Sequence, residues 1–161
     1  MSEKVVVGIS DMQIVKRPHI LITYALGSCV GICLYDSITG VAGMSHVLLP
    51  DSTMCPRDKN VMKFADTAIK ELINQMLLNG AARHRLIAKI AGGAQLFNHS
   101  SSNNLMRIGD RNVESVKMHL KQNNVKIIAE DIGLNYGRTV EFRSDNGSVI
   151  VSSALKGTKN L

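Results

Sequence analysis

The stretch that determines the fold is residues 20–49, ILITYALGSCVGICLYDSITGVAGMSHVLL. Ile20–Leu26 is rich in β-forming residues, and Val30–Tyr35 alternates between two sets of side chains with the period of two that is typical of a strand. Asp36–Gly40 is turn material, and Val41–Leu49 has the composition of a returning strand. The stretch therefore predicts a β-hairpin that follows an earlier strand.

This hairpin carries the residues that point to chemistry. Cys29 follows a Gly-Ser turn, and His46 lies on the returning strand. A thiol has a free pKa of about 8.5, so an imidazole that accepts its proton turns it into a nucleophile. If the loop is the four residues 36–39, Tyr35 pairs with Gly40 and Cys29 falls directly opposite His46. A loop one residue longer turns His46 to the other face, unless a bulge or a bend at Gly43 compensates.

The alternative interpretation is a buried cysteine and a hydrogen-bonded histidine in an ordinary hairpin. Against it stands a resemblance that runs along nearly the whole chain in one order. The motifs that carry it are Leu-Gly-Ser-Cys-Val at 26–30, Leu-Tyr-Asp at 34–36, Gly-Met-Ser-His at 43–46, Leu-Leu-Pro-Asp-Ser at 48–52, Phe64–Ile69, Lys89–Ala94, Ile108–Glu114, Ala129–Gly133 and Gly137–Val140. Together they resemble the chemoreceptor glutamine deamidases, the CheD family.

The resemblance implies hydrolysis of receptor glutamine side chains to glutamate by a cysteine-dependent protein-glutamine glutaminase. The family's nucleophile falls on Cys29, its histidine on His46 and its third catalytic residue on Thr23. It also implies activity on glutamyl methyl esters, binding to the cytoplasmic domains of methyl-accepting chemotaxis receptors, and binding to a CheC-type phosphatase. One departure is visible, because Leu134 follows Gly133 where the family tends to carry a second glycine.

The residues themselves suggest how such a reaction proceeds. Attack by Cys29 on the glutamine carbonyl gives a thioester, and backbone N–H groups of the turn at Gly27 and Ser28 are the natural donors to the oxyanion. His46 passes the proton to ammonia and then activates water. Thr23 would orient the imidazole like the third member of a triad, although Ser28 and Ser45 also offer hydroxyl groups.

Composition sets further limits. The 161 residues suit one domain, 1–161, and the net charge of +6 favours acidic partners. Nucleic-acid binding is not predicted, because no basic helix, aromatic platform or zinc-finger spacing is present. Three cysteines, an odd number, without a signal sequence predict a cytoplasmic protein. The uncharged segment Ile20–Tyr35 is too short and too polar for a membrane-spanning helix, which needs about 20 apolar residues.

Periodicity beyond residue 50 predicts two helices and further strands. The helices are expected at Lys59–Leu78 and Asp110–Asn124, strands at Arg85–Ala91 and Val125–Glu130, and a hairpin around Asn146-Gly147 from Thr139–Arg143 and Ser148–Ser152. Residues 97–107 are expected to form a Ser/Asn-rich loop that is either mobile, which is favoured, or shaped for a partner, and residues 156–161 a loose tail. The predicted fold class is α+β, a layered and mostly antiparallel β-structure with two main helices packed against it.

The sequence also offers two alternative functions, a metal site and a catalytically idle adaptor. A metal site using Cys29, Cys33, Cys55 and His46 is disfavoured, because residues four apart on a strand face are about 13 Å apart and cannot bind one ion. No cofactor is expected, since Gly92-Gly93 lacks the Gly-Lys-Ser/Thr ending of a phosphate-binding loop and fits close backbone packing better. The adaptor alternative is a catalytically idle protein that binds receptors or a phosphatase.

Overall fold

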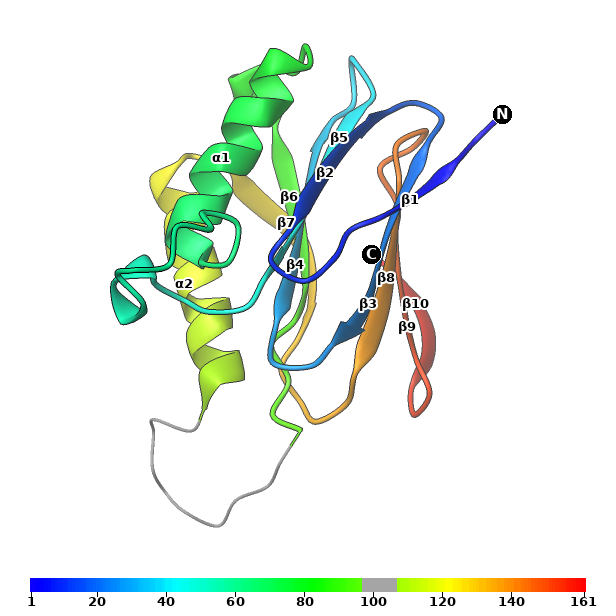
Figure 1. Ribbon diagram of the computed structural model, residues 1–161. Helices are drawn as coiled ribbons and strands as arrows, with labels where there is room; N and C mark the ends of the chain where they lie inside the picture. The colour runs from blue at the N-terminus through cyan, green and yellow to red at the C-terminus, as the bar shows by residue number, and fades with distance from the viewer. Residues whose placement is uncertain (97–106) are drawn as a thin grey trace.

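The computed structural model describes residues 1–96 and 107–161, which form three layers (Figure 1). Two helices cover one face of a five-stranded sheet, and a second five-stranded sheet packs on its other face. The helices are α1 (Ala65–Leu78) and α2 (Ile108–Gln122), and two short 3₁₀ turns, η1 (Ser52–Met54) and η2 (Arg83–Arg85), lie in connections. The predicted α+β class with two helices on the sheet structure is confirmed.

Each sheet mixes parallel and antiparallel pairs. The sheet beside the helices has the order β2 (Met12–Lys16), β5 (Val41–Val47), β4 (Val30–Asp36), β6 (Ile87–Gly92) and β7 (Lys126–Ile132). The outer sheet has the order β1 (Lys4–Val6), β3 (Ile20–Leu26), β8 (Arg138–Arg143), β9 (Val149–Ser153) and β10 (Gly157–Asn160). The parallel pairs are β1 with β3 and β6 with β7.

Strand β4 lies in the middle of the helix-covered sheet and is buried on both faces. Its even-numbered side chains, Val30, Ile32 and Leu34, pack against the helices, while Cys33 and Tyr35 pack between the two sheets. The same alternation on β5 sends Val41 and Val47 toward the helices and Ala42 and Met44 between the sheets. A side chain's position in the chain therefore decides which of the two cores it enters.

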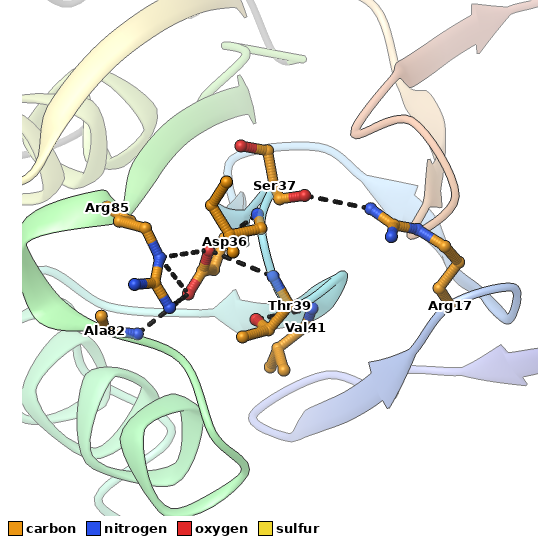
Figure 2. Close-up of polar contacts among 8 residues, drawn as sticks. Arg17, Asp36, Ser37, Thr39, Val41, Ala82 and Arg85 are labelled. Carbon is orange, nitrogen blue, oxygen red and sulfur yellow. Dashed lines mark hydrogen bonds and ion pairs between the residues drawn. The ribbon is translucent and has the colours of Figure 1, made fainter.

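The turn between β4 and β5 is fixed by one buried carboxylate (Figure 2). Asp36 accepts hydrogen bonds from the backbone N–H groups of Ile38, at 3.0 Å, and Ala82, at 2.9 Å. The guanidinium group of Arg85 contacts both oxygens of Asp36, with a shortest distance of 2.8 Å. Burial alone would raise the pKa of Asp36, but these donors outweigh it and the pKa is lowered. The carboxylate thus stays ionised and closes the loop.

Helix α1 starts six residues later than predicted, at Ala65. Asp58 accepts a hydrogen bond from the N–H of Asn60, and Asn60 accepts one from the N–H of Met62, each at 3.0 Å. These bonds offer the backbone an alternative to the helix, which is why the apolar spacing over residues 59–64 does not extend α1. Helix α2, the hairpin of β8 and β9, and its turn at Asn146-Gly147 lie within a few residues of the prediction.

The prediction of a loose tail at residues 156–161 is wrong. Residues 157–160 form β10, which pairs with β9 from Gly157–Ser153 to Asn160–Ile150. Leu161 then exchanges backbone hydrogen bonds with Val149 and packs against the core between the sheets. The predicted loop 97–107 lies, apart from Arg107, outside the described residues. None of the helices described in residues 1–96 and 107–161 is long and apolar enough to cross a bilayer.

Candidate active site

Thr23, Cys29 and His46 come from three successive parts of the chain. Thr23 lies on β3, Cys29 ends the turn that leads into β4, and His46 lies on β5. Cys29 belongs to the core between the sheets, and His46 is on the same face of β5 as Met44. Thr23 and His46 have no exposed surface, and Cys29 keeps 6% of its own. The structure therefore gathers all three predicted residues between the two sheets.

The observed hairpin register differs from the one that would place Cys29 directly opposite His46. The loop is residues 37–40, so Tyr35 pairs with Ala42 rather than with Gly40, and His46 pairs with Gly31 rather than with Cys29. Asp36 is held at the end of β4 by the turn itself and by Arg85, and Gly40 takes a φ of +70° that belongs to a turn. A shift by two residues leaves His46 on the face of Cys29, where such diagonal neighbours are about 7–8 Å apart between backbones.

The imidazole of His46 is held by a chain of two hydrogen bonds. Thr23 Oγ1 lies 2.7 Å from His46 Nδ1 and 2.7 Å from the carbonyl oxygen of Val7. A carbonyl only accepts, so the single hydroxyl proton of Thr23 goes to Val7, and Nδ1 must carry the proton that it donates to Thr23. This leaves Nε2 with its lone pair, the form that can act as a base.

The other ring nitrogen is buried and unused. His46 Nε2 has no hydrogen-bond partner among residues 1–96 and 107–161. Burial lowers the pKa of His46 to about 4. Burial also raises the pKa of the Cys29 thiol, an effect that its own backbone N–H partly offsets. At neutral pH the two groups are therefore a neutral thiol and a neutral imidazole rather than a preformed ion pair.

Gly92 and Gly93 hold the turn that carries Cys29. The N–H of Gly93 donates to the Cys29 carbonyl and that of Ala94 donates to the Gly27 carbonyl, both at 2.8 Å. Gly92 has a φ of +114°, and a Cβ there would overlap the carbonyl oxygen of Cys29. The predicted close backbone packing at this pair of glycines is confirmed.

The two other hydroxyl groups considered beside His46 are placed differently. Ser45 alternates with His46 on β5 and so faces the helices. Ser28 is half-buried in the turn, and its carbonyl accepts a 2.9 Å hydrogen bond from Asn112 of α2. Asn112 falls inside the motif Ile108–Glu114 that carries the family resemblance, but no sequence pattern assigned it a role at the site. Sequence patterns also missed Val7, whose backbone carbonyl accepts the hydrogen bond of the Thr23 hydroxyl group.

The remaining thiols are not part of this group. Cys33 is buried between the sheets, and burial raises its pKa. Cys55 is partly buried just after η1. In the described part of the chain, no cluster of three or more His, Cys, Asp or Glu side chains could hold a metal ion.

A thiol and a free imidazole nitrogen on one face, with a hydroxyl group behind the ring, are the groups that define thiol-dependent acyl-transfer sites. Residues 48–153 match the family described as CheD chemotactic sensory transduction. A probable chemoreceptor glutamine deamidase CheD of Lachnoclostridium phytofermentans is 48% identical over 161 residues, all of both chains. A chemoreceptor glutamine deamidase CheD of Halalkalibacterium halodurans is 44% identical over 162 residues, again all of both chains.

A third relative, a probable chemoreceptor glutamine deamidase CheD of Caldanaerobacter subterraneus, is 49% identical over 153 residues, 95% of this chain and 94% of its own. The chain belongs to the CheD family, and the resemblance noted in its motifs is confirmed. The departure at position 134 has a structural consequence. Leu134 has a φ of +60° directly after Gly133 at +74°, a conformation that glycine adopts with less strain.

Proposed function

We propose that this protein is a glutamine deamidase that acts on chemotaxis receptors through a thioester on Cys29. Membership of a family whose relatives are named chemoreceptor glutamine deamidases supports the substrate. The observation that carries the mechanism is the His46 imidazole on the face of the sheet that holds Cys29: it is fixed at Nδ1 by Thr23, and its Nε2 has no partner among the described residues.

In the proposed reaction, His46 Nε2 takes the proton of the Cys29 thiol as sulfur attacks the side-chain carbonyl carbon of glutamine. Backbone N–H groups of the turn at Gly27, Ser28 and Cys29 stabilise the negative oxygen that develops. The imidazolium then gives its proton to the departing amine, which leaves as ammonia, and a thioester remains. His46 next takes a proton from water, hydroxide adds to the thioester, and the proton returns to the sulfur as glutamate departs.

The neutral resting state fits this sequence of proton transfers. Both groups are uncharged because burial disfavours their charged forms, so the proton moves only when the substrate has excluded water and carbonyl addition consumes the thiolate. A glutamyl methyl ester would pass through the same thioester with methanol in place of ammonia. We therefore include methylesterase activity in the proposal.

The substrate implies the setting. Receptor glutamines lie on cytoplasmic domains of chemoreceptors, so the proposal places the protein in the cytoplasm, where its net charge of +6 favours acidic receptor surfaces. Binding to a CheC-type phosphatase stays a prediction that follows from the resemblance alone. No contact among the described residues argues for it.

The test is to incubate the purified protein with cytoplasmic receptor fragments and measure ammonia release together with the mass gain at each glutamine. Wild-type protein should convert specific glutamines, and Cys29→Ala should abolish conversion while still binding the fragment. Cys55→Ala is the matched control, because that partly buried thiol lies outside the site and its loss should leave the rate unchanged. Conversion by Cys29→Ala would contradict the mechanism, and binding without conversion by wild type would make the protein an adaptor.

A further inference from the structure

The turn that carries Cys29 is held from behind by three consecutive carbonyl groups. Those of Gly27 and Cys29 accept from the N–H groups of Ala94 and Gly93, as described above. The middle one, of Ser28, accepts a hydrogen bond of 2.9 Å from the side-chain amide of Asn112. Two of these three anchors come from backbone, so Asn112 is the one side chain among these three donors to the turn.

Asn112 also holds the end of β5. Its Nδ2 donates a second hydrogen bond, of 3.0 Å, to the carbonyl oxygen of Leu48. The paired register of β4 and β5 ends at Val30 and Val47, and the next residues in line are Cys29 and Leu48. The NH₂ group of Asn112 therefore connects strands β4 and β5 where their backbone pairing ends, between the segments that carry Cys29 and His46.

Among the described residues, the Asn112 side chain is hydrogen-bonded through its NH₂ group and not through its oxygen. Asn112 has no exposed surface, and its Oδ1 has no partner in residues 1–96 and 107–161. Leaving a buried amide oxygen without a partner is unfavourable. The only hydrogen bonds of the Asn112 side chain in the described structure are the two that its NH₂ donates to Ser28 and Leu48.

The Ser28–Cys29 peptide transmits this contact to the sulfur. In a planar trans peptide, the C=O of one residue and the N–H of the next point in opposite directions. Asn112 lies on α2, on the helix side of the sheet, whereas the Cys29 side chain enters the core between the sheets. When Asn112 draws the Ser28 carbonyl toward the helix, the Cys29 N–H must point to the opposite side, where the thiol lies.

We propose that Asn112 is a positioning residue for the reaction: by holding the Ser28 carbonyl, it aims the Cys29 N–H at the thiolate and at the oxyanion. Burial raises the pKa of the Cys29 thiol and that N–H lowers it in part, which agrees with this geometry. The inference rests on the proposed deamidase function, because the oxyanion belongs to that reaction. Asn112 itself touches no reacting atom.

The chain offers a matched control one helical turn further along. Ser115 is also buried on α2 and also donates to a backbone carbonyl, that of Pro50, at 2.7 Å. Its loss removes the same kind of bond between α2 and the loop after β5, but no contact to the Cys29 turn. Ser115→Ala therefore measures the structural cost of such a bond alone.

The experiment compares full-length wild type, Asn112→Ala, Asn112→Leu and Ser115→Ala; leucine keeps the shape of asparagine in case alanine impairs folding. Three quantities are measured: kcat and KM on receptor fragments, the pH profile of iodoacetamide alkylation at the Cys29 peptide, and Tm. Both Asn112 variants should lower kcat by about tenfold to a hundredfold with KM little changed, and shift the alkylation midpoint to higher pH. Ser115→Ala should keep kcat within about twofold at a similar loss of Tm.

Equal kcat and equal alkylation profiles for the Asn112 variants and Ser115→Ala would overturn the inference. The alkylation profile separates this failure from failure of the proposed function. If wild type deamidates nothing while the Asn112 variants still shift the midpoint, the function falls and the positioning role stands. If wild type deamidates and neither the midpoint nor kcat responds to Asn112, the positioning role falls and the function stands.

Discussion

His46 is the residue whose environment leads to a direct test by pH. Burial lowers its pKa to about 4, whereas an unfolded chain gives histidine a pKa of about 6.5. As pH falls below 6.5, the unfolded state takes up this proton first, so the free energy of unfolding decreases until about pH 4. At about 1.4 kcal/mol per pH unit, lowering the pH from 7 to 5 should cost about 2 kcal/mol through His46 alone.

Urea unfolding at pH 7 and pH 5, for wild type and His46→Gln, measures this contribution. Glutamine does not titrate, so the loss of stability between the two pH values should be about 2 kcal/mol smaller in the variant. The groups that titrate elsewhere are shared by both proteins and cancel in the comparison. The same loss in both would mean that His46 is not held neutral in the folded protein.

The sequence predicts which residues form the candidate site, but it does not predict the way that they are held. Cys29 and His46 are singled out by the motifs Leu-Gly-Ser-Cys-Val and Gly-Met-Ser-His, which resemble those of the CheD family. The donors and acceptors that orient them come from far along the chain: Val7 is 16 residues before Thr23, and Asn112 is 84 residues after Ser28. Single residues at such separations leave no local pattern.

At the level of elements, the β4–β5 hairpin depends on Asp36 more than on its apolar pattern. Asp36→Asn keeps the shape of the side chain and removes the negative charge that pairs with Arg85. Breaking a buried ion pair typically costs about 3–5 kcal/mol, and the partial exposure of Arg85 reduces this to about 2–3 kcal/mol. Denaturant unfolding of wild type and Asp36→Asn should show this loss.

Glu130→Gln is the control for that measurement. Glu130 forms an exposed ion pair with Lys117 at 3.2 Å, and such pairs contribute about 0–1 kcal/mol. The pKa of Asp36 is lowered in the folded state, so its contribution is present above the unfolded value of about 3.9 and is lost as the pH falls below it. Equal destabilisation by the two substitutions would show that Asp36 does not fix the turn.

The same carboxylate explains why the sequence left the register of the hairpin open. Apolar alternation fixes which residues of one strand share a face, but whether Cys29 and His46 share a face depends on the loop. It does not fix where the loop begins, because that depends on Arg85, which lies 49 residues from Asp36. Short strands such as β1 and β2 escaped prediction for a similar reason, since their partners, β3 and β5, are adjacent to them in the sheet but not next to them in sequence.

At the scale of the whole molecule, the site requires both sheets. His46 belongs to the helix-covered sheet. Thr23 belongs to the outer sheet, and Val7, whose carbonyl holds Thr23, directly follows strand β1 of that sheet. The outer sheet ends at β10, and Leu161, directly after it, packs against the core between the two sheets. Whatever loosens the packing of one sheet on the other therefore weakens the hold on the imidazole as well as the fold.

The last five residues contribute to this packing through Lys89. On β6, the ammonium group of Lys89 donates to the carbonyl oxygens of Leu161, at 2.7 Å, and Gly147, at 3.0 Å. Removing residues 157–161 takes away β10, the Leu161 contact and one of the two acceptors for a partly buried charge. We expect a loss of about 2–4 kcal/mol, since each hydrogen bond contributes about 0.5–1.5 kcal/mol and an unpaired buried charge costs more.

For a domain of this size that loss corresponds to a Tm lower by about 5–15 °C. Thermal unfolding of the truncated chain measures it, with Leu155→Ser, a change at a side chain 75% exposed, as the control that should leave Tm unchanged. Lys89→Met adds a sharper comparison. In the full chain it removes two hydrogen bonds and should destabilise, but in the truncated chain it removes a poorly paired charge and should recover stability. A truncated chain with the Tm of wild type would instead mean that residues 157–161 are a tail after all.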